Sequence, residues 1–200
     1  MDIVYYKDLL LCGLMYNMIF NISGYIRPNI KLAQNTYSLV HSVASTYYSA
    51  KYLINLDDYS YYMFTIISSS YFMNDILYYI WYYNKQSLMY ITHHVITLIT
   101  LYNNNFLMGV ALFLAESSNI SNNLTHRAIV LDSSRQVIKR CKQIQLYSWI
   151  ILRNMMMGFS IIYYRDIFVE MKGYVQIMYI SLYSISLFWS YKLYKSYITT

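Results

Sequence analysis

Two adjacent histidines, His93 and His94, lie in the middle of an otherwise apolar stretch at residues 88–101. At helical spacing, His93 belongs to one polar stripe and His94 lies about 100° further round the helix. The stripe consists of Tyr90, His93, Thr97 and Thr100. Ionisable residues inside a membrane are costly and commonly mark a functional interior, so the pair predicts a site. The alternative is two histidines that only pack between helices.

The chemistry open to such a pair is proton transfer or nucleophilic attack. A neutral imidazole can act as a general base toward an amine or hydroxyl, or attack a thioester directly. Asp75 would set the tautomer of a neighbouring histidine, and Arg153 could hold a phosphate or carboxylate. A cavity with apolar walls and a polar floor, open to the cytosol, would suit an acyl chain that carries a polar head.

Metal binding is the rival use of these histidines. One zinc ion could be held by His41, a histidine of the pair and a carboxylate. Di-iron membrane enzymes use more histidines than the four in this chain. The cysteines, Cys12 and Cys141, have no metal-ligand spacing. We therefore expect no bound metal.

The elements that must position these residues are membrane helices. Only 12% of the residues are charged, against about 25% in a typical soluble domain. Stretches of the length that a ~30 Å hydrocarbon core requires recur along the chain. Seven such spans are predicted, at 8–26, 36–56, 59–83, 87–103, 105–124, 146–164 and 174–194. The fold class is therefore an all-α membrane protein with seven transmembrane helices.

The distribution of lysine and arginine orients this arrangement. Most of the 15 basic residues fall on one side of the seven predicted spans, so the C-terminus should be cytosolic and the N-terminus lumenal. A long basic loop is expected at 125–145 on the cytosolic side. Because topology accounts for the net charge of +6, nucleic acid is not an expected partner. Residues 1–35 are predicted to be an anchor and a cytosolic link, and residues 36–200 the main domain.

Six ionisable residues share one predicted depth in the membrane. Counting from the cytosolic end of each span places them about 8–12 Å inside. They are His41, Asp75, His93, His94, Glu116 and Arg153. Unpaired charges in lipid are costly, so Asp75 or Glu116 should pair with Arg153 or a histidine. The alternative is that these groups only hold the helices together by hydrogen bonds.

Four short motifs resemble those of the TLC domain, named for the TRAM, LAG and CLN8 proteins. They are LVHS at His41, YFMND ending at Asp75, HHVIT at residues 93–97 and ESS at 116–118. The likeness covers residues 36–195 and implies a six-helix barrel in the endoplasmic reticulum or Golgi with a lipid-related role. The family includes the ceramide synthases of sphingolipid metabolism, which use acyl-CoA and an essential histidine pair; that resemblance would make His93 and His94 the acyl-transfer residues.

The region after the histidine pair differs from the ceramide synthases. Residues 115–124 lack their HDxSD-type motif and are similar to the ExSTPFxN of smaller TLC-domain proteins, with Glu116, Ser118 and Asn123 matching. The resemblance therefore favours the smaller branch of the family. Ceramide synthesis itself does not follow from it.

The predicted function is binding or processing of a lipid acyl chain in an intramembrane polar cavity. As an enzyme, the protein would be an acyl-CoA-dependent acyltransferase without a bound cofactor. The expected catalytic residues are His93, His94 and Asp75, and the expected substrate-binding residues are His41, Thr97, Glu116, Ser118, Asn123 and Arg153. Membrane lipids are the expected partners, and self-association is left open. The alternatives are a non-catalytic lipid-sensing or trafficking protein and a small transporter with a histidine–aspartate proton relay.

Overall fold

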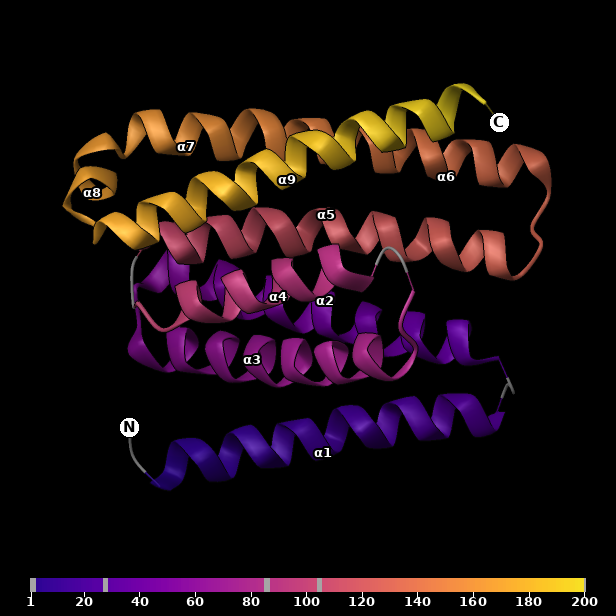
Figure 1. Cartoon of the computed structure of the whole chain (residues 1–200), viewed down its shortest axis with the longest axis horizontal. Helices are drawn as coiled ribbons and strands as arrows, with labels where there is room; N and C mark the ends of the chain where they lie inside the picture. The colour runs from indigo at the N-terminus through magenta and orange to yellow at the C-terminus, as the bar shows by residue number, and fades with distance from the viewer. Residues whose placement is uncertain (1–2, 27–28, 85–86, 104–105, 200) are drawn as a thin grey trace.

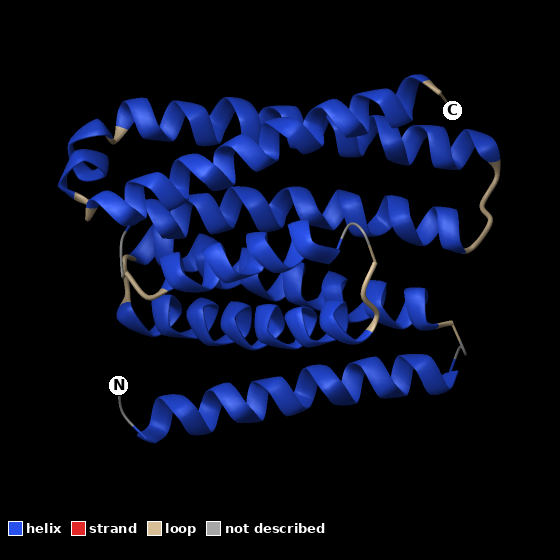
Figure 2. Cartoon of the chain, viewed as in Figure 1, coloured by secondary structure: helices blue, strands red, loops and turns tan. Residues whose placement is uncertain are grey.

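The computed structural model describes residues 3–26, 29–84, 87–103 and 106–199, and these residues are helical apart from short turns (Figures 1 and 2). The elements are α1 (Ile3–Ile26), α2 (Ile30–Asn55), α3 (Asp58–Trp81), α4 (Ser87–Leu101), α5 (Phe106–Val130), α6 (Arg135–Ser148), the π-helix η1 (Trp149–Met156), α7 (Met157–Tyr163), α8 (Arg165–Glu170) and α9 (Gly173–Ile198). No strand occurs within those ranges. The predicted all-helical class is confirmed.

The helices run roughly along one direction, and their contacts follow a closed order (Figure 1). Helix α2 packs on α3, α3 on α4, and α4 on α9. Helix α9 packs on the continuous rod formed by α6 and η1, that rod packs on α5, and α5 packs back on α2. Helix α1 lies at the edge of the bundle against α2 and α3. This order brings the helices that carry the predicted site residues around one interior.

Polar side chains fill much of that interior, while large apolar side chains cover the outside. Serines on α2 and α3 are almost fully buried, and Ser45 and Ser68 hydrogen-bond to each other across the two helices at 3.0 Å. Small residues of this kind allow close approach of helices in a membrane bundle. The outer faces carry exposed residues such as Leu14, Leu77 and Phe159. An apolar outer surface around an interior that is partly polar suits a surrounding of lipid.

Helix α1 is the part of the described chain that is long and apolar enough to cross a membrane, over Val4–Ile26. Helix α4 is apolar but shorter. Polar contacts tie α1 to α3, because Tyr62 donates a hydrogen bond to Asp8 at 2.7 Å and Asn17 donates to Asn74 at 2.9 Å. The first helix is therefore attached to the bundle along much of its length.

The basic loop predicted at 125–145 is wrong, because most of that segment is helical. Helix α5 continues to Val130, and α6 begins at Arg135, where the Ser134 side chain accepts a hydrogen bond from the backbone N–H of Val137. Most of the charged residues of α6 are exposed, and the polar composition concealed the helix. Similarly, α2 begins at Ile30 and not at 36, since Asn29 caps it.

Glycine at position 109 permits the close approach of α5 to α2. A Cβ atom there would lie 2.8 Å from ring atoms of Tyr52. Real side chains do not approach so closely, so a larger residue would have to displace the tyrosine ring.

We expect Gly109→Leu to destabilise the bundle by about 1–3 kcal/mol, the usual cost of overpacking a well-packed interface. The measurement is the thermal unfolding midpoint of the full chain in detergent. Gly173→Leu is the control, because a Cβ atom at Gly173 has no neighbour within 4 Å. Equal midpoints for the two variants would contradict a close α2–α5 contact.

Candidate functional site

A buried histidine–aspartate pair joins α4 to α3. His94 Nε2 lies 2.7 Å from Asp75 Oδ2, and both side chains are buried. The other carboxylate oxygen accepts hydrogen bonds from the Tyr37 hydroxyl at 2.6 Å and from Gln34 Nε2 at 3.4 Å. A carboxylate in this position favours the tautomer with the proton on Nε2. The predicted role of Asp75 as the group that orients a histidine has the geometry it needs.

His93 has different surroundings from His94. Its Nδ1 is buried without a hydrogen-bond partner, and Nε2 has no partner among the described residues. The ring stands edge-on to Trp189, with centroids 5.2 Å apart, and lies 5.4 Å from the ring of His94. His93 thus has no hydrogen-bond partner on either ring nitrogen in the described part of the chain, whereas His94 is bonded through Nε2 and only its Nδ1 lacks a partner.

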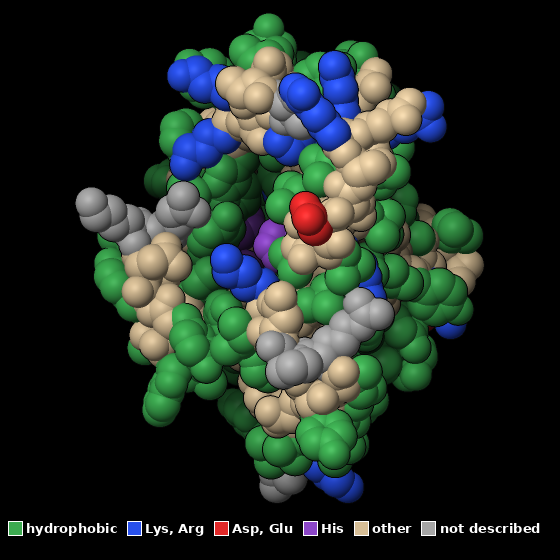
Figure 3. Space-filling view, turned by 90° about the vertical axis from the view of Figure 1, so that its right-hand side faces the viewer, with side chains coloured by type: hydrophobic (Ala, Val, Ile, Leu, Met, Phe, Trp, Pro, Cys, Tyr) green, Lys and Arg blue, Asp and Glu red, His purple; other side chains and the backbone are tan. Residues whose placement is uncertain are grey.

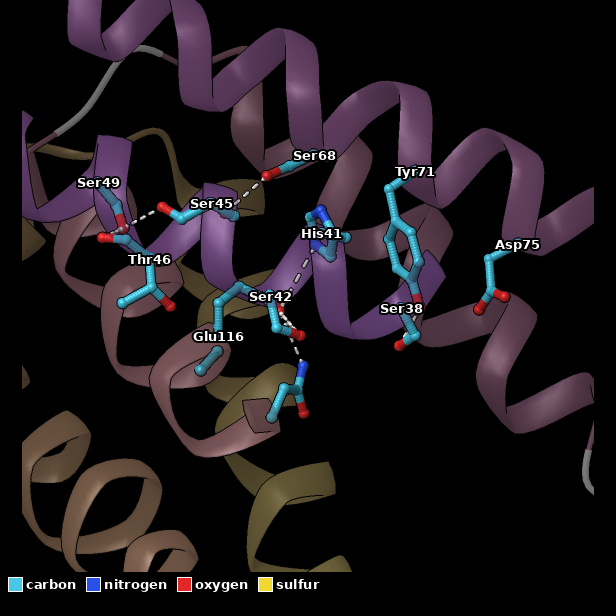
Figure 4. A network of polar contacts seen from close by, with 12 residues as sticks. Ser38, His41, Ser42, Ser45, Thr46, Ser49, Ser68, Tyr71, Asp75 and Glu116 are labelled. Atoms are coloured by element: carbon cyan, nitrogen blue, oxygen red, sulfur yellow. Dashed lines mark hydrogen bonds and ion pairs between the residues drawn. The ribbon is translucent and has the colours of Figure 1, made fainter. Parts of the chain in front are cut away.

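A second ionisable pair lies on the other side of Tyr71. His41 Nε2 lies 3.5 Å from Glu116 Oε2, which also accepts hydrogen bonds from Ser42 and Asn119. The His41 ring stacks on Tyr71 with centroids 3.9 Å apart and an interplanar angle of 2°. Figure 4 shows Tyr71 between His41 and Asp75. The two carboxylates therefore pair with two histidines, one on each side of this ring.

Arg153 is buried on η1 and touches no carboxylate among the described residues within ion-pair distance. Its Nε donates to Ser118 Oγ at 2.6 Å, and Nη2 donates to Ala115 O and Asn119 Oδ1. The guanidinium carbon lies 3.9 Å from the centroid of the Trp149 ring. π-Helical turns often occur at functional sites. Uncharged acceptors and one indole thus hold the guanidinium in a fixed plane.

Two cavities meet at His93 and Arg153, which line both. The larger one, here called the vestibule, has a volume of about 390 Å³. Its lining includes Gln34, Asp75, His94, Asn122, Trp189 and Lys192. The smaller one, here called the inner cavity, has a volume of about 50 Å³. Its lining includes Thr97, Leu101, Met108, Leu112, Glu116 and Met157.

The vestibule lies toward the end of the bundle where α2 begins and α5 ends. Figure 3 looks onto that end and shows a hollow with histidine inside it and lysine and arginine side chains around it. The inner cavity lies deeper and its walls are mainly apolar. The vestibule is therefore more polar than the inner cavity. We call the position of His93 and Arg153, the two residues that line both cavities, the neck.

The structure brings most of the predicted site residues to these cavities. His93, His94, Asp75, Asn123 and Arg153 line the vestibule. Thr97 and Glu116 line the inner cavity, together with His93 and Arg153. Ser118 lines neither cavity and supports Arg153.

The expectation that His41 lines the same cavity is wrong. His41 is 1% exposed, and Tyr71 fills the space between it and the vestibule. Its imidazole pairs with Glu116 instead. The predicted pairing of a carboxylate with a histidine holds for both carboxylates, whereas Arg153 uses neutral acceptors.

Sequence reasoning missed Tyr37, Trp149 and Trp189 as parts of the site. Tyr37 lies one helical turn before His41, but in a chain with 27 tyrosines the residue type carries little information. Trp149 lies four positions before Arg153, which is a usable signal because such residues face the same side of a helix. Within the described ranges, no group of three His, Cys, Asp or Glu residues could hold a metal ion.

Substitutions at two adjacent serines test the hydrogen bond that Arg153 Nε donates to Ser118. Ser118→Ala should destabilise the protein by about 1–3 kcal/mol, because it leaves the buried Nε without its acceptor. Ser117→Ala is the matched control, since Ser117 bonds only to the carbonyl of Phe113 in its own helix. The measurement is denaturant unfolding in detergent. A loss for Ser117→Ala as large as that for Ser118→Ala would contradict the assignment.

The family model of the TLC domain, which is that of TRAM, LAG1 and CLN8, matches residues 31–195. No curated protein and no solved structure matches the chain. The matched range contains every residue of the two histidine–carboxylate pairs and Arg153. Because the model covers most of the sequence, the chain belongs to the TLC-domain family.

Proposed function

We propose that this protein is a multi-pass membrane protein of lipid metabolism that binds an acyl chain across its two cavities and transfers it at His93. The family supports a membrane lipid-related role. The observation that carries the proposal is the change from a polar vestibule to an apolar inner cavity at a neck lined by His93 and Arg153.

The membrane arrangement belongs to the same proposal. The closed order of helix contacts from α2 to α9 would form a six-helix barrel, with α1 as a further span beside it. The apolar outer face and the polar interior support this placement in lipid. Basic residues near the vestibule would then face the cytosol and the N-terminus the lumen. The location in the endoplasmic reticulum or Golgi is an expectation from the family resemblance.

A bound amphiphile would lie with its head in the vestibule and the first carbons of its chain directed into the inner cavity. Because that cavity has a volume of about 50 Å³, the surrounding helices would have to move apart to admit a longer chain. The bond that joins head and chain would then lie at the neck, beside the free Nε2 of His93. Trp189 stands against the ring of His93 and would hold it in place. Arg153 and Glu116 would position the polar groups of the ligand on either side of that bond.

The reaction would be acyl transfer from a thioester such as acyl-CoA. His93 Nε2 would accept the proton of an acceptor hydroxyl or amine while the acceptor forms a bond to the thioester carbonyl carbon. The carbon–sulfur bond would then break, and the leaving thiolate would take the proton back from the imidazolium. His94 and Asp75 would not touch the substrate bond. The carboxylate of Asp75 would hold the His94 ring in place, and the two groups together would stabilise the positive charge that develops on His93.

A non-catalytic lipid-binding or lipid-sensing protein is the second candidate. The observation that favours it is that both carboxylates already have hydrogen-bonded partners within the bundle, as does His94. Polar groups that are satisfied in this way can serve structure alone. In that case the cavity would bind a lipid and no product would form.

The two candidates are separated by acyl-transfer assays and lipid analysis of cells that express the chain. His93→Ala and His94→Ala should each lower product formation by at least about 100-fold, the usual range for a general base. Thr92→Ala is the control, because Thr92 is exposed on the same helix. Unchanged product in both histidine variants would remove the enzymatic proposal. A changed lipid distribution without a new product would identify a binder.

A further inference from the structure

Two cations line the vestibule, and neither contacts a carboxylate directly within the described chain. Arg153 and Lys192 line it, and the carboxylate in its lining belongs to Asp75. That carboxylate is occupied by His94 and Tyr37. Among the described residues, neither cation forms an ion pair, and Lys192 makes a cation–π contact with Phe188 at 4.7 Å. An anion would therefore find two cations that no carboxylate of the described chain contacts directly.

The guanidinium of Arg153 keeps one free donor group. Its Nε and Nη2 atoms are bonded to Ser118, Ala115 and Asn119, while Nη1 has no hydrogen-bond partner in the described part of the chain. The side chain is buried, and it lines the vestibule. Its link to Glu116 is indirect, because Asn119 accepts a hydrogen bond from Arg153 and donates one to Glu116. A buried charge without a counter-ion in direct contact is costly. The stacked and triply anchored guanidinium is thus a preorganised donor for an oxyanion.

An amide group supplies a further donor beside these cations. Gln145 Nε2 donates to Asn122 Oδ1 at 2.6 Å, so the amide oxygen of Asn122 faces α6. Its Nδ2 has no partner among the described residues, and Asn122 lines the vestibule. The vestibule therefore offers N–H groups of three kinds, which is the chemistry that recognises several oxygens on one centre.

We infer that the vestibule binds the phosphate monoester head of an amphiphile, with Arg153 Nη1, Lys192 Nζ and Asn122 Nδ2 as its donors. A phosphate monoester carries a charge of about −1.5 to −2 near neutral pH and has several oxygens, so it can contact both cations at once. A choline phosphodiester would add a cation where the lining carboxylate is already paired. The inference rests on the proposed function, because the chain of the same amphiphile would be directed toward the inner cavity.

Direct binding measurements on the purified full chain in neutral nanodiscs test this inference. The probes are a monoacylglycerol phosphate, the uncharged monoacylglycerol with the same chain, and inorganic phosphate. Trp149 and Trp189 line the vestibule, so tryptophan fluorescence reports occupancy. We expect the phosphate amphiphile to bind at least about 30-fold more tightly than the uncharged one, and inorganic phosphate to bind weakly and to compete.

Substitutions then locate the site. Lys192→Gln should lower the affinity for the phosphate amphiphile about tenfold, as loss of a charged hydrogen bond does, and leave that for the uncharged one unchanged. Lys139→Gln is the control, because Lys139 is an exposed lysine on α6 that does not line the vestibule. Arg153→Lys serves as a second variant that keeps the charge but loses the fixed fork, and it should weaken binding as well.

The outcomes separate the two levels of the proposal. Equal affinity for the charged and uncharged amphiphiles, or equal losses for Lys192→Gln and Lys139→Gln, would overturn the phosphate inference and leave acyl-chain binding intact. Inorganic phosphate that binds as tightly as the amphiphile would overturn it in favour of a free-phosphate site. Binding of neither amphiphile would contradict the proposed function itself.

Discussion

The hydrogen bond between His94 and Asp75 is the interaction on which the rest of the structure depends. It joins α4 to α3 over a distance of 2.7 Å. The Tyr37 hydroxyl donates a hydrogen bond to the same carboxylate and so connects α2 to the pair. A buried carboxylate without such partners would be strongly destabilising. By holding one imidazole between helices, the bond also leaves the neighbouring His93 turned toward the cavities. The placement of both histidines thus depends on one hydrogen bond between α4 and α3.

The polar interior divides into a part that holds the helices together and a part that faces a ligand. His41 and Ser42 belong to the first, since they line neither cavity and contact Glu116, which itself lines the inner cavity. His93 and Arg153 belong to the second, because they line both cavities and keep donor or acceptor groups without a partner. Tyr71 separates the two parts, with His41 stacked on one side. This division explains how a bundle can use many buried polar groups to hold its helices together and still have polar groups left to bind a ligand.

Much of this arrangement could be predicted from sequence, because apolar periodicity gives the helices and a common depth gives the cluster. The partners of each charge could not, since they depend on helix rotation. Arg153 donates to Ser118 and Asn119 and contacts neither carboxylate. Its place on η1 sets the guanidinium against the Trp149 ring. The helix at 135–148 was missed because its polar face outweighs its apolar one. His41 was placed in the cavity because a sequence does not show that an aromatic ring intervenes.

Photo-crosslinking tests most directly whether an acyl chain enters the bundle. A fatty acyl probe with a diazirine at the chain end would be bound to the purified protein in nanodiscs, and the labelled residues identified by mass spectrometry. The account predicts labelling of Met108 and Met157, which are buried around the inner cavity. Labelling confined to exposed outer residues such as Met155 and Leu187 would contradict it.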